Sequence, residues 1–153
     1  MKRKIISMTI ITISMIVMCF SNAFATMSTH TSSISYPAGG YGYSSSEYKS
    51  EAASQYSTRL TGVGFIGLPA GQFPNSTTNI YFTPVDPTTL SAIAGRNYHN
   101  KNHMNSNTVK HDYYYSGYTG SGFYVKLRAE SNYTATGNTV GVKWNLGYVS
   151  ALP

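Results

Sequence analysis

The sequence predicts an all-β protein, a two-sheet antiparallel β-sandwich of about six or seven short strands. Three observations support this fold class. Tyrosine, threonine, serine and glycine are abundant, with 14 tyrosines in 153 residues, and aromatic and β-branched residues favour strands. Two segments near the C-terminus alternate between apolar and polar residues. Turn-forming residues separate the remaining apolar runs at short intervals.

The two alternating segments cover residues 123–130 and 140–148. In the first, one face carries Phe123, Val125, Leu127 and Ala129, and the other carries Tyr124, Lys126, Arg128 and Glu130. In the second, one face carries Val140, Val142, Trp144, Leu146 and Tyr148. This pattern is typical of strands with one buried face, so we expect Trp144 in the core. The polar stretch 131–138 predicts that the two strands form a hairpin.

Four further strands are predicted at residues 55–66, 79–85, 93–99 and 109–115. The polar stretch 100–107 is expected to be a loop. Residues 26–50 are rich in serine, glycine and tyrosine, and we expect them to form a flexible leader or one edge strand near 35–43. The sandwich domain is therefore expected to span residues 51–153, a suitable length for a single core.

The N-terminus has the features of a secretory signal peptide over residues 1–25. A basic start at Lys2, Arg3 and Lys4 precedes an apolar run, and Ala23-Phe24-Ala25 is a small-residue cleavage motif. We expect cleavage between Ala25 and Thr26, and a secreted protein that is extracellular or loosely associated with the cell surface. No cysteine follows Cys19, which excludes disulfides and thiol catalysis and suits a Gram-positive bacterium.

The net charge argues against nucleic acid as a partner. The formal charge of the whole chain is +6, and loss of the three basic residues at its start leaves eight basic and five acidic residues, a net charge of +3. The basic residues are scattered rather than clustered, which allows only a weak attraction to anionic cell-wall polysaccharide or to a membrane surface.

No catalytic motif is recognisable, and we expect a protein that is not an enzyme and needs no cofactor. Glycoside hydrolysis requires two carboxylates about 5–10 Å apart, and the five acidic residues show no cluster in the sequence. His99 and His103, with His111 beside Asp112, supply nitrogen and oxygen ligands for a metal if their loop folds back. A solvated polar loop is the alternative, and we predict no metal site.

Three segments resemble a known family. They are His111-Asp112-Tyr113-Tyr114-Tyr115, the run Val-Lys-Leu-Arg-Ala-Glu-Ser-Asn-Tyr at 125–133, and the strand carrying Trp144. Their order resembles a family of small secreted Firmicute proteins with a Tyr/Ser/Asn-rich β-domain of unknown function. In that family an Asn-rich run precedes a terminal strand with a tryptophan, and here the run is reduced to Ser131-Asn132. The resemblance implies a secreted β-domain without catalytic residues.

The best candidate for a binding site is the polar face of residues 123–130. Tyr124, Lys126 and Arg128 place an aromatic ring beside two cations, which suits stacking on a sugar polymer that bears phosphate or carboxylate. The alternative is that these tyrosines only stabilise a pleated surface. We therefore expect a non-catalytic extracellular accessory protein that binds cell-wall polymer. A bacteriocin-like effector that acts on membranes is the second hypothesis.

Overall fold

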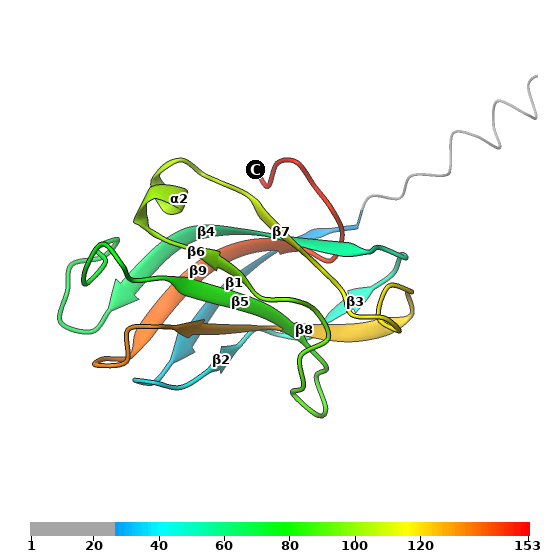
Figure 1. Ribbon diagram of the computed structural model, residues 1–153, viewed down its shortest axis with the longest axis horizontal. Coiled ribbons are helices and arrows are strands. Elements are labelled where there is room, and N and C mark those ends of the chain that lie inside the picture. Colours follow the sequence, from blue (N-terminus) through cyan, green and yellow to red (C-terminus); the bar gives the residue numbers. More distant parts are fainter. Residues whose placement is uncertain (1–26) are drawn as a thin grey trace, which may run out of the picture.

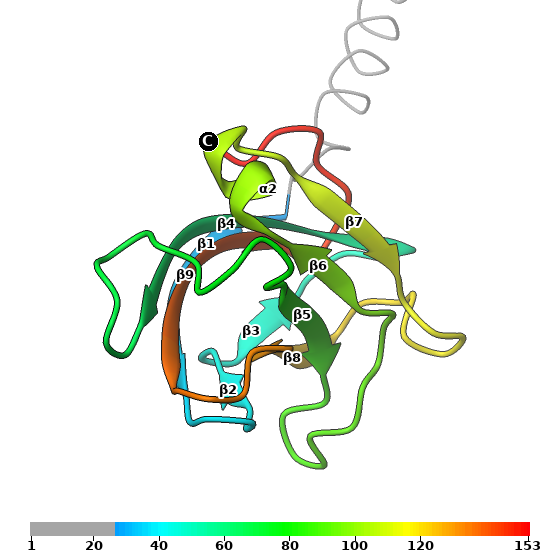
Figure 2. The same ribbon diagram turned by 60° about the vertical axis from the view of Figure 1, so that its left-hand side comes forward.

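Residues 27–153 are described by a computed structural model, and they form two antiparallel β-sheets packed face to face (Figure 1, Figure 2). The predicted all-β sandwich is confirmed. The predicted signal peptide, Cys19 and the cleavage site between Ala25 and Thr26 lie outside the described residues. Between residues 27 and 153, no helix has the length and apolar character needed to cross a bilayer.

Sheet 1 has four strands in the order β1-β9-β4-β7. Their bounds are β1 Thr29–Tyr36, β4 Gln55–Phe65, β7 Lys110–Tyr113 and β9 Asn138–Asn145. The central strand β9 pairs with β1 along one side and with β4 along the other. The register of β4 shifts between Leu60 and Gly62, so this long strand bends at a β-bulge.

Sheet 2 has five strands. Four of them follow the order β2-β8-β5-β6, and β3 pairs with the first residues of β8, 123–125. Their bounds are β2 Gly42–Tyr43, β3 Glu47–Lys49, β5 Ile80–Val85, β6 Asn97–His99 and β8 Phe123–Ser131. One short helix, α2, covers Lys101–Asn105. It replaces the loop predicted there, because the Asn100 side chain accepts a hydrogen bond from the backbone N–H of His103 and caps the turn.

The core lies between the sheets and is filled by the apolar faces that the alternation predicts. Val125, Leu127 and Ala129 of β8 are fully buried, and Trp144 of β9 lies among them with no exposed surface. The indole N–H of Trp144 donates to Ser32 Oγ at 3.0 Å. The burial of Trp144 is confirmed, whereas Tyr148, expected on the same face, lies beyond β9 and is exposed.

The predicted hairpin of residues 123–130 and 140–148 is wrong. β8 belongs to sheet 2 and β9 to sheet 1, and the connection between them crosses from one sheet to the other. The physical reason is that both strands have a strongly apolar face. Placing them in opposite sheets buries these two faces against each other, while a hairpin would place both faces side by side on one sheet. Tyr133 lies in this connection, and its ring packs edge-on against Phe65.

The N-terminal segment contributes more than the leader or single edge strand that we expected. β1 begins at Thr29 and forms a full edge of sheet 1, and β2 and β3 add to sheet 2. Ile34 and Tyr36 of β1 point into the core and are buried. A Cβ atom on Gly42 would lie 2.3 Å from the Ser35 carbonyl oxygen, so glycine allows β2 to approach β1 where the two sheets meet. The sandwich therefore includes residues 29–49.

Two other predicted strands are shorter in the structure than in the sequence prediction. Of residues 93–99 only Asn97–His99 form β6, and of residues 109–115 only Lys110–Tyr113 form β7. Single β-bridges at Ala94 and Ala92 continue the pairing without forming regular strands. The strands predicted at 55–66 and 79–85 are present almost to the residue.

Candidate functional site

The outer face of sheet 2 gathers tyrosines and cations from four strands and two loops. Because Val125, Leu127 and Ala129 face the core, the alternate residues of β8 face outward. The paired registers place Tyr48 of β3 beside Tyr124, and Tyr81 of β5 between Glu130 and Tyr98. We call this surface the tyrosine face. It consists of Tyr41, Tyr48, Tyr81, Thr83, Arg96, Tyr98, Tyr124, Lys126, Arg128 and Glu130.

The three residues predicted as a binding strip do share this face. Tyr124 has 57% of its surface exposed, and Lys126 and Arg128 are half-buried. Arg128 is more constrained than the sequence indicates. Its guanidinium carbon lies 4.7 Å from the centroid of the Tyr41 ring, and its Nη2 lies 3.8 Å from Glu130 Oε1. These contacts fix the plane of the guanidinium, which favours directional recognition of an anion.

Glu130 also forms an ion pair with a second arginine, Arg96. Arg96 Nη1 donates to Glu130 Oε1 at 3.2 Å, and the Arg96 guanidinium lies 4.3 Å from the centroid of the Tyr81 ring. One carboxylate is thus shared by two arginines, each of which is stacked on a tyrosine. The cluster keeps a net positive charge, because Arg96 and Arg128 together outweigh Glu130.

Two aromatic pairs lie at opposite ends of the tyrosine face, and of their four rings only that of Tyr81 is half-buried. The rings of Tyr48 and Tyr124 are 5.2 Å apart between centroids, and those of Tyr81 and Tyr98 are 6.4 Å apart. The distance along β8 from Tyr124 to Glu130, which is opposite Tyr81, is about 20 Å at the usual rise per strand residue. The face therefore has the length to accommodate an extended polymer, with aromatic platforms at its ends and cations between them.

Two buried polar atoms at the centre of the face lack hydrogen-bond partners within residues 27–153. They are Arg128 Nε and Thr83 Oγ1. Arg128 and Thr83 are direct cross-strand partners, so a donor and a hydroxyl lie unsatisfied next to each other. An unsatisfied buried polar group costs about 1–3 kcal/mol. The same feature occurs at other buried side chains of residues 27–153, among them Arg59, Asn97 and Thr136, so it is not by itself specific to the tyrosine face.

The tyrosine face contains residues that sequence reasoning did not identify. Tyr41 and Arg96 lie outside regular strands, so periodicity carried no information about where they point. Tyr81 and Thr83 follow the period of β5, but their position beside Arg128 and Glu130 depends on the pairing of β5 with β8. Alternation along the sequence does not show that β5 pairs with β8, so it could not place these residues together.

The three histidines of the candidate metal site lie in different surroundings. His99 lies inside the core, where its Nε2 is 2.9 Å from Thr58 Oγ1, and burial lowers its pKa to about 3. His103 lies beside it with the rings 6.0 Å apart. His111 is on β7, where its Nδ1 is 2.9 Å from Ser57 Oγ. The described part of the chain contains no group of three or more metal-ligating side chains that would hold an ion.

One lysine is buried in an aromatic and carbonyl cage. Lys49 of β3 has no exposed surface, and its ammonium group donates to the backbone carbonyls of Glu51, Thr119 and Gly120. It also lies 4.8 Å from the centroid of the Tyr114 ring. Burial lowers the pKa of Lys49 to about 8. All of its donors have carbonyl partners, so this lysine ties the 116–122 loop to sheet 2.

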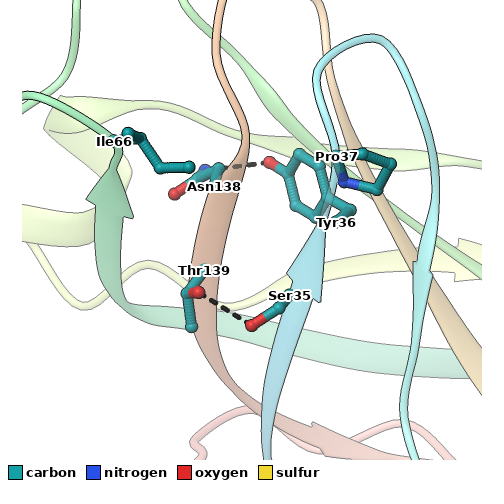
Figure 3. Close-up of a pocket in the computed structure, with 6 residues that line it drawn as sticks. All are labelled: Ser35, Tyr36, Pro37, Ile66, Asn138 and Thr139. Carbon is teal, nitrogen blue, oxygen red and sulfur yellow. Dashed lines mark hydrogen bonds between the residues drawn. The ribbon is translucent and has the colours of Figure 1, made fainter.

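A pocket of about 290 Å³ lies at one end of sheet 1 (Figure 3). It is lined by Ser35, Tyr36, Pro37, Ile66, Asn138 and Thr139. The hydroxyls of Ser35 and Thr139 are 2.8 Å apart, and Asn138 Nδ2 donates to the Tyr36 hydroxyl at 2.9 Å. The polar groups of the pocket therefore satisfy one another. Its rim is apolar and includes the exposed side chain of Ile66.

The fold and this surface define a small two-sheet β-sandwich whose outer face combines exposed tyrosines with stacked arginines. Comparison of the chain with family models, curated proteins and solved structures finds no match. The assignment of a function therefore rests on the geometry of the tyrosine face.

Proposed function

We propose that the protein is a secreted, non-catalytic accessory protein of a Gram-positive cell surface, and that its tyrosine face binds a wall polysaccharide bearing phosphate or carboxylate groups. The observation that carries this proposal is the joint presence of exposed tyrosine pairs and ring-stacked arginines on one sheet face. Tyrosine rings stack on the apolar faces of sugars, and arginine binds phosphate and carboxylate oxygens with directed N–H donors.

The charges of the face favour an anionic polymer over a neutral one. Lys126, Arg96 and Arg128 oppose a single acidic side chain, Glu130. Stacking alone would serve a neutral sugar, and a protein that bound only neutral sugar would gain nothing from these cations. The unsatisfied Nε of Arg128 and hydroxyl of Thr83 add hydrogen-bonding capacity beneath them.

The acidic side chains support a non-catalytic role, because most of them have structural partners. Glu130 is shared by two arginines, and Glu47 pairs with His30 at 3.1 Å. Asp86 accepts hydrogen bonds from the backbone N–H groups of Thr88 and Thr89, and these bonds lower its pKa. Carboxylates held in this way are poorly suited to proton transfer or nucleophilic attack.

Cosedimentation with purified Gram-positive cell walls tests the proposal. Walls are used intact and after hydrolysis of their phosphate-bearing polymers, and binding is measured at low and high salt. We expect wild-type protein to bind intact walls, to bind hydrolysed walls at least tenfold more weakly, and to lose affinity as salt screens the charges.

The variant for this experiment is Tyr48→Ala with Tyr124→Ala, which removes one aromatic pair. The matched control is Tyr113→Ala, because Tyr113 is also an exposed tyrosine, 63% exposed, but belongs to β7 in sheet 1. We expect the double variant to bind at least tenfold more weakly and the control to bind like wild type. Equal binding by the double variant, or equal binding to intact and hydrolysed walls, contradicts the proposal.

A further inference from the structure

Three loops at one end of the sandwich carry no charged side chain of their own. The loops at this end cover residues 37–41, 66–79 and 132–137, and they contain no Asp, Glu, Lys, Arg or His. They lie together at the left of Figure 1. The backbone N–H of Ile66 donates to the Gly137 carbonyl at 3.1 Å, and the pocket in Figure 3 joins Pro37 to Ile66. We call this surface the uncharged end.

The uncharged end exposes aliphatic side chains. Ile66 is 70% exposed and Leu68 is 39% exposed, and residues 67, 69 and 70 between and after them are also exposed. Most of the large apolar residues exposed within residues 27–153 are tyrosines, which have a polar hydroxyl. Ile66 and Leu68 have no polar group, so their exposure to water has no compensating hydrogen bond.

The loop that carries these two residues is held in place by backbone hydrogen bonds. Leu68 donates to the Phe65 carbonyl at 3.0 Å, and Gly71 donates to the Val63 carbonyl at 2.8 Å. Gly67 and Gly71 have φ angles of +87° and +80°, which glycine adopts at little cost. Phe73 packs against Phe65 and fixes the far side of the loop. The backbone therefore presents Ile66 outward rather than folding it into the core.

Three cations, Arg96, Lys101 and Arg128, lie beside the uncharged end. Lys101 of α2 shares a small pocket with Ser76 of the loop between β4 and β5. Arg128 lies over Tyr41, which belongs to the uncharged end. Arg96 and Arg128 both contact Glu130 near the start of the 132–137 connection. This collar of Arg96, Lys101 and Arg128 outweighs its one carboxylate by two charges.

We propose that the uncharged end docks on an anionic phospholipid bilayer, with Ile66 and Leu68 in the interfacial region and the collar against the headgroups. Apolar side chains beside cations are what an anionic lipid surface binds. A second copy of the chain fits less well, because two collars would repel and two large aliphatic side chains are far less than a stable protein interface requires. Docking here shares Tyr41, Arg96 and Arg128 with the tyrosine face but does not use the Tyr48–Tyr124 pair.

Vesicle flotation tests the docking directly. The probes are vesicles of equal parts phosphatidylglycerol and phosphatidylcholine, and vesicles of phosphatidylcholine alone. We expect the mature chain to partition at least tenfold more strongly to the anionic vesicles. The variant Ile66→Ser with Leu68→Ser should lose at least tenfold in this partition coefficient. The control is Leu90→Ser, because Leu90 is 38% exposed, like Leu68, but lies at the opposite end of β5. We expect this control to partition like wild type.

A second readout follows the position of the loop. The mature chain has no cysteine, so Ile66→Cys and Leu90→Cys each provide one attachment point for an environment-sensitive NBD dye. We expect anionic vesicles to raise the emission of the dye at position 66 and to leave that at position 90 unchanged.

Three results would overturn the proposal. They are equal binding to both vesicle types, unchanged binding by the Ile66→Ser, Leu68→Ser variant, and a dimer in sedimentation velocity that this variant abolishes. Tyr48→Ala with Tyr124→Ala separates the two functions, because wall binding should fall and vesicle binding should persist.

Discussion

Arg128 and Thr83 lie opposite each other on β8 and β5, and each has a buried polar atom without a hydrogen-bond partner among residues 27–153. If the tyrosine face binds the polymer as proposed, we expect the Thr83 hydroxyl to have a role in binding, and valine has the same shape without this hydroxyl.

The substitution Thr83→Val tests this role. We expect the free energy of unfolding to stay unchanged or to rise by about 1 kcal/mol, because an unsatisfied buried hydroxyl is removed. Affinity for the wall polymer should fall several-fold, because the ligand loses a hydrogen-bonding partner. Chemical denaturation and wall cosedimentation measure the two effects. Lower stability together with unchanged affinity would show that the hydroxyl is structural.

Arg128→Lys tests the geometry of the stacked guanidinium. Lysine keeps the positive charge but lacks the planar group that stacks on Tyr41 and directs several donors at once. We expect wall binding to weaken at least fivefold, while Lys126→Arg, which also keeps the charge, changes it little. If both variants bind like wild type, charge alone accounts for the affinity and the stacked geometry is irrelevant.

His99 makes the stability of the fold sensitive to acid. Burial is the largest cause of its low pKa, about 3, and the neighbouring His103 and Lys110 lower it further. An unfolded chain binds the same proton at about pH 6.5. Between pH 6.5 and 3 the unfolded state therefore holds more protons, and the free energy of unfolding falls as the pH falls, by at most about 1.4 kcal/mol per pH unit from this group.

Urea denaturation between pH 7 and pH 4 measures this effect. We expect His99→Gln to flatten the dependence of stability on pH, because glutamine does not titrate and keeps a polar contact available for Thr58. A slope as steep as that of the wild-type protein would assign the acid sensitivity to other groups.

Trp144 is the largest fully buried side chain in the described residues. Trp144→Ala should cost about 3–5 kcal/mol of folding free energy, because it removes a bulky core side chain and leaves a cavity. Trp144→Phe should cost less, since the ring that remains fills part of the space. Tyr124→Ala on the outer face should change stability by no more than about 0.5 kcal/mol. A similar small loss for Trp144→Ala would place the indole outside the core.

The parts of the fold that the sequence predicts are those that depend on local alternation. The period of two in residues 123–130 correctly separates Val125 and Leu127 from Tyr124 and Lys126. The same pattern does not say which strand pairs with which. β8 and β9 are neighbours in sequence yet lie in opposite sheets, because only the full set of apolar faces determines which strands must meet across the core.

The candidate site is partly predictable for the same reason. Tyr124, Lys126 and Arg128 share a face because they share one strand. The contacts of Arg128 with Tyr41 and Glu130, and the position of Thr83, depend on a loop and on the pairing of β5 with β8. The burial of Lys49 is not predictable from the sequence, because lysine is almost never fully buried unless its ammonium group has partners, as it has here in backbone carbonyls.

The most direct test of the central claim is an NMR titration of a protein of residues 26–153 with a soluble, phosphate-bearing wall polysaccharide fragment. We predict that amide shifts change along β8, β5 and β3, around Tyr124, Arg128 and Thr83, while those of β1 and β7 in sheet 1 stay constant. Shift changes that cluster on sheet 1, or none at fragment concentrations that saturate wall binding, would contradict the assignment of the tyrosine face as the polymer-binding surface.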